Sequence, residues 1–379
     1  MKRRPAPHSG GVRARVRRRG APRARRPRIS NVVPVRAFAG YLFRVAASRL
    51  RRQQRATELA YDQVVRGPVW ACTDLGAFPR PPVPLPGIEG VVVMEDRHPQ
   101  FFLSFREYTP QAGTGLNRHG PLRRWSTQRD LLELVGALHA QGTRVLIGCW
   151  NYGGWWPLPQ SRWLRRHPEL RRVPGSADLN PFVRLEREDM PYAEYVGCQY
   201  ERLRAAFGFD GLMLGDGFCG FGSFVAPDLH DDREDAIPEW TQFYRTVAAR
   251  VHEAGGVLFA YDYMGFPVRE ARRHGVDYRA VAGAGLDVLV YQAYPQAWGR
   301  YWLAEQRGRF GLHACVRNLA NVRAALAGTG TRVLYTVEIR DSVERWVAEA
   351  TATSRQMAAL DPLADGRFLV WANDLIARR

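Results

Sequence analysis

The sequence predicts an α/β protein, a (β/α)₈ barrel preceded by a disordered basic tail. Past residue 85, short β-rich runs alternate with longer segments of helical periodicity, and eight such units over about 290 residues match this fold. The runs are almost continuously apolar, which is typical of parallel strands covered by helices. An open doubly wound sheet would usually carry a glycine-rich phosphate loop after its first strand, whereas this chain has MEDRHPQFF there.

Eight runs are predicted to be strands because each is short and largely apolar, and most of them contain β-branched residues. The third is the weakest, since its apolar run is very short. They are residues 90–94, 144–148, a segment near 177–179, 211–214, 257–260, 287–291, 332–337 and 367–371.

Three helices are predicted between these strands from apolar residues at helical spacing. The first begins at the capping pair Thr127 and Asp130 and stops at Gly142. The second spans residues 237–251 before Gly255, and the third includes residues 343–350.

The charge of the chain is concentrated at its N-terminus. Residues 1–55 contain 18 Lys and Arg and no Asp or Glu, so the remaining 324 residues carry 37 basic and 37 acidic groups. Because the tail is rich in Arg, Pro and Gly, we expect residues 1–55 to be disordered and residues 56–379 to form the barrel domain. A start codon assigned too early would explain such an extension. A nucleic-acid arm is the alternative, and nucleic acid is the less favoured partner.

Other classes of protein fit the composition poorly. No stretch reaches the 18 apolar residues of a membrane span, and Arg36 and Arg44 interrupt the best signal-peptide candidate. Five dispersed cysteines without C-x-x-C spacing predict neither a disulfide framework nor a zinc site. We therefore expect a cytoplasmic protein without a metal or a cofactor; the oligomeric state is left open.

The residues that follow the predicted strands are the place to look for chemistry, because barrel active sites lie at the C-terminal strand ends. Asp216 follows the fourth run between two glycines, Asp262 follows the fifth between two tyrosines, and Glu338 follows the seventh. Facing carboxylates of this kind are what cleavage of a glycosidic bond requires.

Aromatic and polar residues around these carboxylates are predicted to bind substrate, since flat rings can stack on sugars. They are Trp150, Tyr152, Trp155, Trp156, Phe218, Tyr261, Tyr291, Gln292, Tyr294, Trp298, Trp371 and Asp374.

The segments ADLNPFVRLE and FGFDGLMLGDGF resemble the third-to-fourth-strand region of (β/α)₈ glycoside hydrolases of the α-amylase and α-galactosidase groups. The resemblance is clearest over residues 140–265. It implies that Asp216 is the nucleophile or its equivalent, and that an oligo- or polysaccharide is the substrate. Asp210, which starts the strand, is interpreted as structural.

The chain departs from each of these groups, so the acid/base remains open between two residues. An α-amylase-type enzyme has Glu after the fifth strand and Asp after the seventh, where this chain has Asp262 and Glu338. An α-galactosidase-type enzyme has its acid after the sixth strand, where this chain has Tyr291 and Gln292. Asp262 is the first choice, because its tyrosine neighbours favour a raised pKa. Glu338 is the second choice; it could instead stabilise charge or orient substrate.

One alternative function and one candidate cation site stand beside this hypothesis. A catalytically inactive carbohydrate-binding barrel would keep the aromatic residues but lack a carboxylate pair at catalytic spacing. The acidic segment 227–240 offers oxygen ligands for a hard cation, but acidic residues and Pro238 before a helix favour a helix start.

Overall fold

The computed structural model describes residues 61–74, 78, 82–94, 128–149, 163, 166–170, 179–215, 218, 234–261, 265, 267–273, 275–296, 311–339, 350–370, 372 and 375–376. Its main sheet is a closed barrel of parallel strands in the order β1-β10-β9-β8-β7-β6-β3-β2. The predicted (β/α)₈ fold is therefore confirmed. The predicted tail, residues 1–55, lies outside the described residues.

The barrel strands are β1 (Val69–Asp74), β2 (Ile88–Met94), β3 (Arg144–Cys149), β6 (Gly211–Leu214), β7 (Val257–Tyr261), β8 (Val288–Tyr291), β9 (Arg332–Val337) and β10 (Gly366–Leu369). Seven of them match predicted runs within two residues.

One predicted strand is wrong, and one was missed. The segment near 177–179 is not a barrel strand, because β3 pairs directly with β6. Leu179 is apolar because it is buried in the outer core instead. The missing strand is β1, VWACTD, which ends in two polar residues and lies ahead of the predicted alternation that begins past residue 85.

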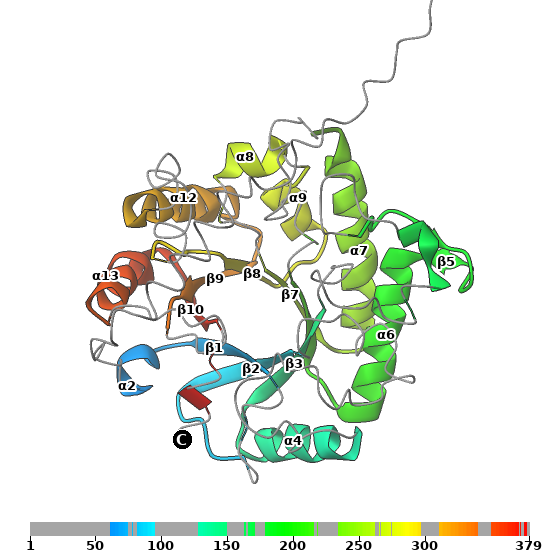
Figure 1. Cartoon of the computed structure of the whole chain (residues 1–379). Helices are drawn as coiled ribbons and strands as arrows, with labels where there is room; N and C mark the ends of the chain where they lie inside the picture. The colour runs from blue at the N-terminus through cyan, green and yellow to red at the C-terminus, as the bar shows by residue number, and fades with distance from the viewer. Residues whose placement is uncertain are drawn as a thin grey trace, which may run out of the picture.

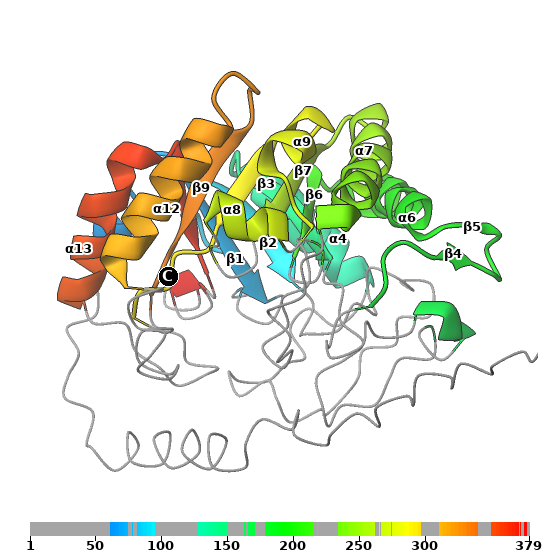
Figure 2. The ribbon, with the colours of Figure 1, turned by 90° about the horizontal axis from the view of Figure 1, so that it is seen from above.

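Helices surround the barrel in Figure 1, and in Figure 2 the strand arrows run in one common direction. They are α2 (Tyr61–Val64), α4 (Gln128–Ala140), α6 (Tyr192–Phe207), α7 (Ile237–Glu253), α8 (Val268–Arg273), α9 (Tyr278–Gly283), α12 (Leu312–Ala325) and α13 (Ala350–Leu360). Short 3₁₀ turns, η4 (Pro168–Leu170), η5 (Glu234–Ala236) and η7 (Asp361–Leu363), and a hairpin of β4 (Arg184–Leu185) and β5 (Met190–Pro191) complete the described elements.

The helix predictions agree with these elements where they can be compared. Helices α4 and α7 have the predicted positions, and Gly142 follows α4 with a φ of +76° that suits glycine. Helix α13 begins at Ala350, and the earlier part of the third predicted helix lies outside the described residues.

The barrel interior is packed with side chains and is not a pore. Trp70 from β1 lies across the interior with its ring centroid 4.7 Å from that of Phe259. A Cβ at Gly90 would lie 2.3 Å from the Trp70 ring, which explains the glycine in β2. Near the N-terminal strand ends, Arg332 donates two hydrogen bonds, of 3.0 and 3.2 Å, to the carboxylate of Glu89. This ion pair joins the N-terminal ends of β2 and β9.

Three aspartates each tie a strand to its neighbour and to an outer helix. Each directly precedes a strand, and its carboxylate accepts a hydrogen bond from an amide of the preceding barrel strand. Each is also paired with a basic side chain in the last turn of a helix. Asp210 binds Val145 N (2.8 Å) and His139 (2.8 Å), Asp287 binds Leu258 N (2.7 Å) and His252 (2.8 Å), and Asp365 binds Val333 N (2.8 Å) and Arg323. The structural role predicted for Asp210 is thus confirmed.

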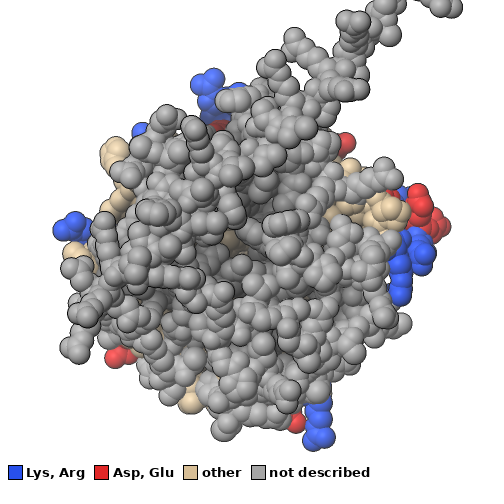
Figure 3. All heavy atoms as spheres, in the orientation of Figure 1, with Lys and Arg blue, Asp and Glu red and all other residues tan. Residues whose placement is uncertain are grey.

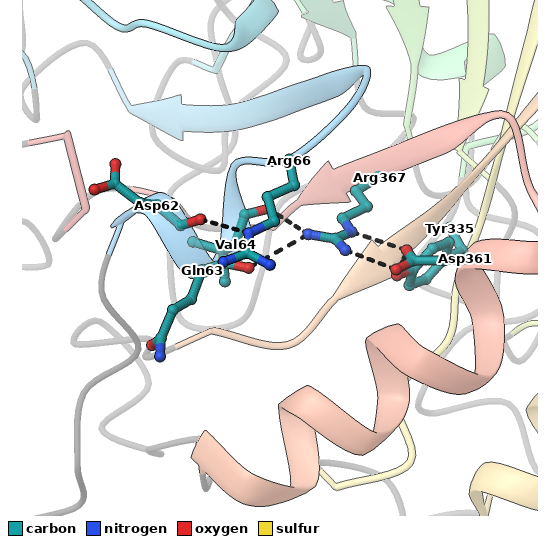
Figure 4. A network of polar contacts seen from close by, with 7 residues as sticks. All are labelled: Asp62, Gln63, Val64, Arg66, Tyr335, Asp361 and Arg367. Atoms are coloured by element: carbon teal, nitrogen blue, oxygen red, sulfur yellow. Dashed lines mark hydrogen bonds and ion pairs between the residues drawn. The ribbon is translucent and has the colours of Figure 1, made fainter.

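Arg367 connects the last barrel strand, β10, to α2, as Figure 4 shows. Its guanidinium donates to Asp361 Oδ1 and Oδ2 at 2.9 and 2.7 Å, and to the carbonyl oxygen of Val64 at 2.8 Å. Tyr335 also donates to Asp361, at 2.7 Å. Because the Arg367 side chain is only 9% exposed, these bonds staple β10 and η7 to the C-terminal end of α2.

The outer surface of the described part carries mixed charge. In Figure 3 the acidic and basic side chains that are visible lie around the rim, with both signs present. Within the described residues, none of the helices is both long enough and apolar enough to cross a membrane.

We predict that Arg367→Met lowers the free energy of unfolding by about 2 to 3 kcal/mol, because it removes a buried guanidinium and leaves the α2 carbonyl without its donor. Urea denaturation followed by circular dichroism measures this. The control is Arg129→Met on α4, where the side chain is 87% exposed and the midpoint should not move. An equal midpoint for both variants would contradict the staple.

The lowered pKa of Asp365 predicts that the folded protein loses stability in acid. Burial alone would raise the pKa of Asp365, but hydrogen bonds from Arg323 and the Val333 amide lower it below the ordinary 3.8. A depressed folded pKa contributes stability that is present above pH 3.8 and is lost as the pH falls through the folded pKa. We expect Asp365→Asn to be less stable than wild type at pH 7, with a difference that shrinks below about pH 4. A difference independent of pH would contradict this.

Candidate functional site

The candidate site lies at the C-terminal ends of β6, β7, β8 and β9, where the described residues include Gly215, Tyr261, Tyr294 and Glu338. Several of the predicted site residues lie outside the described residues. They are Asp216, Asp262, Trp150, Tyr152, Trp155, Trp156, Trp298, Trp371 and Asp374.

The residues on both sides of Asp216 are held firmly. The amide of Gly215 donates to the carbonyl of Cys149 at 2.7 Å, which extends the β3–β6 ladder by one position. Phe218 is fully buried, its ring centroid lies 5.4 Å from that of Phe243, and its carbonyl accepts a 2.9 Å bond from the Tyr244 hydroxyl. This placement does not support the predicted contact of Phe218 with substrate; the residue anchors the loop that carries Asp216.

The loop after β7 has a similar anchor. Tyr291 is fully buried in β8, and its hydroxyl donates to the carbonyl of Gly265 at 2.8 Å. A Cβ at Gly265 would lie 2.1 Å from the carbonyl oxygen of Gln292, and φ there is +57°, so glycine is needed. Tyr291 and the backbone of Gln292 thus fix the return of the loop that carries Asp262. Buried in this way, Tyr291 has no ring face for a sugar, and the side chain of Gln292 is itself 5% exposed.

The register of β6 and β7 relates the two candidate aspartates. The strands are hydrogen-bonded neighbours, and Leu214 is aligned with Ala260. Asp216 follows Leu214 by two residues, and Asp262 follows Ala260 by two residues. The two carboxylates therefore occupy equivalent sequence positions past aligned ends of adjacent strands.

A pair of tyrosines marks the described part of the mouth. Tyr261, at the end of β7, belongs to the interior cluster, and its ring centroid lies 5.9 Å from that of Phe368. Its hydroxyl is hydrogen-bonded to the hydroxyl of Tyr294, which follows β8. Tyr294 is only partly buried. Tyr261 is only 6% exposed, so the partly buried Tyr294 presents most of the accessible ring surface of this pair, at the C-terminal end of the apolar interior.

Glu338 lies deeper than the sequence suggests. Glu338 is only 1% exposed, and its Oε2 accepts a 2.8 Å hydrogen bond from the backbone amide of Gln296. Its own carbonyl accepts from the Thr353 hydroxyl at 2.8 Å. Thr353 also accepts a bond from the side-chain amide of Gln296, at 3.0 Å. Glu338 is therefore part of a buried polar network that links β9, α13 and the segment after β8.

Gln356 of α13 holds the ends of β8 and β9 together beyond their last ladder pair, Tyr291 with Tyr335. Its side-chain amide donates to the carbonyls of Ala293 and Thr336, at 2.8 and 2.9 Å, and accepts from the amide of Glu338 at 3.3 Å. Gln356 is fully buried. A side-chain amide thus replaces the backbone partner that a continuing strand would supply.

Cys315 on α12 borders the same network. Burial raises the pKa of the Cys315 thiol to about 12, with a further contribution from the negative charge of Glu338 and an opposing one from the Tyr294 amide. The thiol is therefore neutral at physiological pH and packs as an apolar group.

Thr353 and Gln356 were missed by the sequence analysis. Their signal is present, because both stand on the helix face that also carries Met357 and Leu360, which is the buried face of α13. Polar residues on an apolar helix face point to a buried hydrogen-bond network.

A metal centre is not supported by the side chains in view. Among the described residues, no group of three or more His, Cys, Asp or Glu side chains is placed to hold a metal ion.

Comparison with known proteins gives little beyond outline similarity. No family model matches the chain, and no curated protein matches it significantly. The glycoside hydrolase domain of PgaB (BpsB) from Bordetella bronchiseptica is 17% identical, with 83% of this chain and 96% of that chain covered and a TM-score of 0.48. A cycloalternan-degrading enzyme from Trueperella pyogenes is 13% identical, with 88% and 45% covered and a TM-score of 0.47.

The carboxyl transferase domain of pyruvate carboxylase from Rhizobium etli is 12% identical, with 82% of this chain and 40% of that chain covered and a TM-score of 0.41. Similarity at this level carries no argument about activity, and these neighbours have different chemistries. The fold rests on the closed barrel itself, and the function has to be argued from the residues.

We predict that Gln356→Leu lowers the free energy of unfolding by about 2 to 4 kcal/mol, because it removes three buried hydrogen bonds, those that Gln356 makes with the Ala293 and Thr336 carbonyls and with the Glu338 amide. Chemical denaturation measures the effect. Gln242→Leu on the exposed face of α7 is the matched control. If both variants unfold at the wild-type denaturant midpoint, Gln356 does not hold the strand ends.

Proposed function

We propose that this protein is a glycosidase or transglycosidase that acts at the C-terminal mouth of the barrel, with Asp216 as nucleophile or equivalent and Asp262 as acid/base. The observation that carries the proposal is the register of β6 and β7, which aligns Leu214 with Ala260 two residues before the two aspartates. Aligned positions on neighbouring strands are about 4.8 Å apart. Retaining glycosidases use carboxyl groups about 5 to 5.5 Å apart.

The surroundings favour a site that keeps its geometry. Tyr244 and Tyr291 anchor the loops that carry Asp216 and Asp262, through Phe218 and Gly265. Catalysis by a positioned acid and nucleophile depends on such rigidity, because small displacements of the reacting groups lower the rate strongly.

The proposed substrate is an oligo- or polysaccharide. Tyr294 is partly exposed and is hydrogen-bonded to the buried Tyr261; its ring suits the apolar face of a sugar, and its hydroxyl suits the sugar hydroxyls. The aromatic residues of segment 150–163, together with Trp298 and Trp371, are proposed to extend this surface.

The test is turnover of a panel of aryl α- and β-glycosides and natural oligosaccharides by the wild type, Asp216→Asn and Asp262→Asn. We expect Asp216→Asn to lose activity by at least about 10³-fold. Asp262→Asn should lose about 10²- to 10⁴-fold on substrates with poor leaving groups and less on aryl glycosides, because a good leaving group needs no acid.

Asp189→Asn is the matched control, since its side chain is 88% exposed in the turn between β4 and β5. Wild-type turnover that persists in Asp216→Asn would contradict the proposal. Sugar binding without turnover by the wild type, unchanged in Asp216→Asn, would favour an inactive carbohydrate-binding barrel instead.

A further inference from the structure

We propose that Glu338 is a positioning residue: its buried carboxylate fixes the segment after β8 and thereby places Tyr294 against Tyr261 at the mouth. This inference assigns a role to the third predicted carboxylate and leaves Asp262 as the acid. Its link to turnover rests on the proposed function, but its structural core does not.

Glu338 contacts the backbone of the segment after β8 directly. Oε2 of Glu338 lies 2.8 Å from the amide nitrogen of Gln296, two residues beyond Tyr294. A hydrogen bond from a backbone amide to a carboxylate is stronger than one between neutral groups, and burial excludes competing water. The bond therefore holds the backbone of Gln296 at a fixed distance from the end of β9.

The hydrogen bond between Glu338 and Gln296 also completes a ring of hydrogen bonds with Thr353. The side chain of Gln296 donates to the Thr353 hydroxyl at 3.0 Å, and that hydroxyl donates to the carbonyl of Glu338 at 2.8 Å. Gln296 is thus held to Glu338 twice, once through its backbone and once through Thr353. All three residues are at least nine-tenths buried.

The backbone ahead of Tyr294 is fixed as well. The amide of Ala293 donates to the Thr336 hydroxyl at 2.7 Å, and the Ala293 carbonyl accepts a 2.8 Å hydrogen bond from the side chain of Gln356. Tyr294 and Pro295, which are both partly exposed, therefore lie between two fixed residues, Ala293 and Gln296.

The segments after three neighbouring strands, β6, β7 and β8, are each anchored by a buried side chain. The loops after β6 and β7 are each anchored by a buried tyrosine hydroxyl bound to a backbone carbonyl. After β8 the anchored group is an amide, which needs an acceptor, and Glu338 supplies it. A buried carboxylate used in this way is suited to positioning and not to protonating a leaving group, which requires access to substrate.

The direct experiment is hydrogen exchange of the Gln296 amide, followed by mass spectrometry of the full chain. In Glu338→Ala we expect this amide to exchange at least about tenfold faster than in wild type, because its acceptor is removed. In Glu338→Gln exchange should stay within about twofold of wild type, since the amide oxygen of Gln can still accept the bond. Glu133→Ala on α4 is the control and should change nothing. Unaltered exchange in Glu338→Ala would overturn the proposal.

The kinetic experiment uses the best glycoside found for the wild type. Glu338→Ala should lower kcat/KM, and Glu338→Gln should restore most of it with an unchanged pH profile. In a Tyr294→Ala background, Glu338→Ala should have little further effect, because the residue it positions is gone. A fall in Glu338→Gln as large as that in Asp262→Asn, or fully additive losses with Tyr294→Ala, would overturn the positioning role.

The two proposals fail in different ways. If Gln296 exchange rises in Glu338→Ala while no glycoside is turned over by the wild type, the positioning role is supported and the glycosidase proposal is contradicted. If glycosides are cleaved through Asp216 and Gln296 exchange is unaltered, the opposite holds.

Discussion

The parallel ladder between β1 and β10 joins the first strand of the barrel to the last, and Arg367 holds that joint from outside. The ladder aligns Val69 with Arg367, and the guanidinium then reaches both Asp361 and the carbonyl of Val64. Without this closure the sheet would have two open edges and its C-terminal strand ends would not converge. The relative positions of the C-terminal strand ends therefore depend on the contact between β1 and β10.

Closure of the barrel alone does not place functional groups. Buried hydrogen bonds also hold the segments that follow three of the strands. Each of three successive loops returns to the barrel at a buried hydrogen bond, made by Tyr244, Tyr291 or Glu338. The anchors are polar and buried, so breaking one leaves an unpaired group in a low-dielectric environment. Such anchors favour a single loop geometry, which a site with two cooperating carboxylates needs.

The fold was largely predictable, because apolar runs, helix caps and glycine stops report directly on local structure. The failures have physical reasons: β1 ends in the polar residues Thr73 and Asp74 and lies ahead of the alternation that begins past residue 85, and Leu179 is apolar because it packs outside the barrel. The site was harder. Phe218 and Glu338 follow strands and Tyr291 ends one, positions where a sequence predicts contact with substrate, but the direction of a side chain depends on packing. The helix spacing of Thr353 and Gln356 indicates that both are buried, but it does not indicate their partners, Gln296 and Thr336, which are distant in sequence.

The most direct measurement is a crystal structure of Asp216→Asn with an oligosaccharide that the wild type cleaves. The account predicts that the scissile bond lies over the C-terminal ends of β6 and β7, between residue 216 and Asp262, with a sugar ring against Tyr294. A sugar bound on the outer helices or at the N-terminal end of the barrel would contradict it.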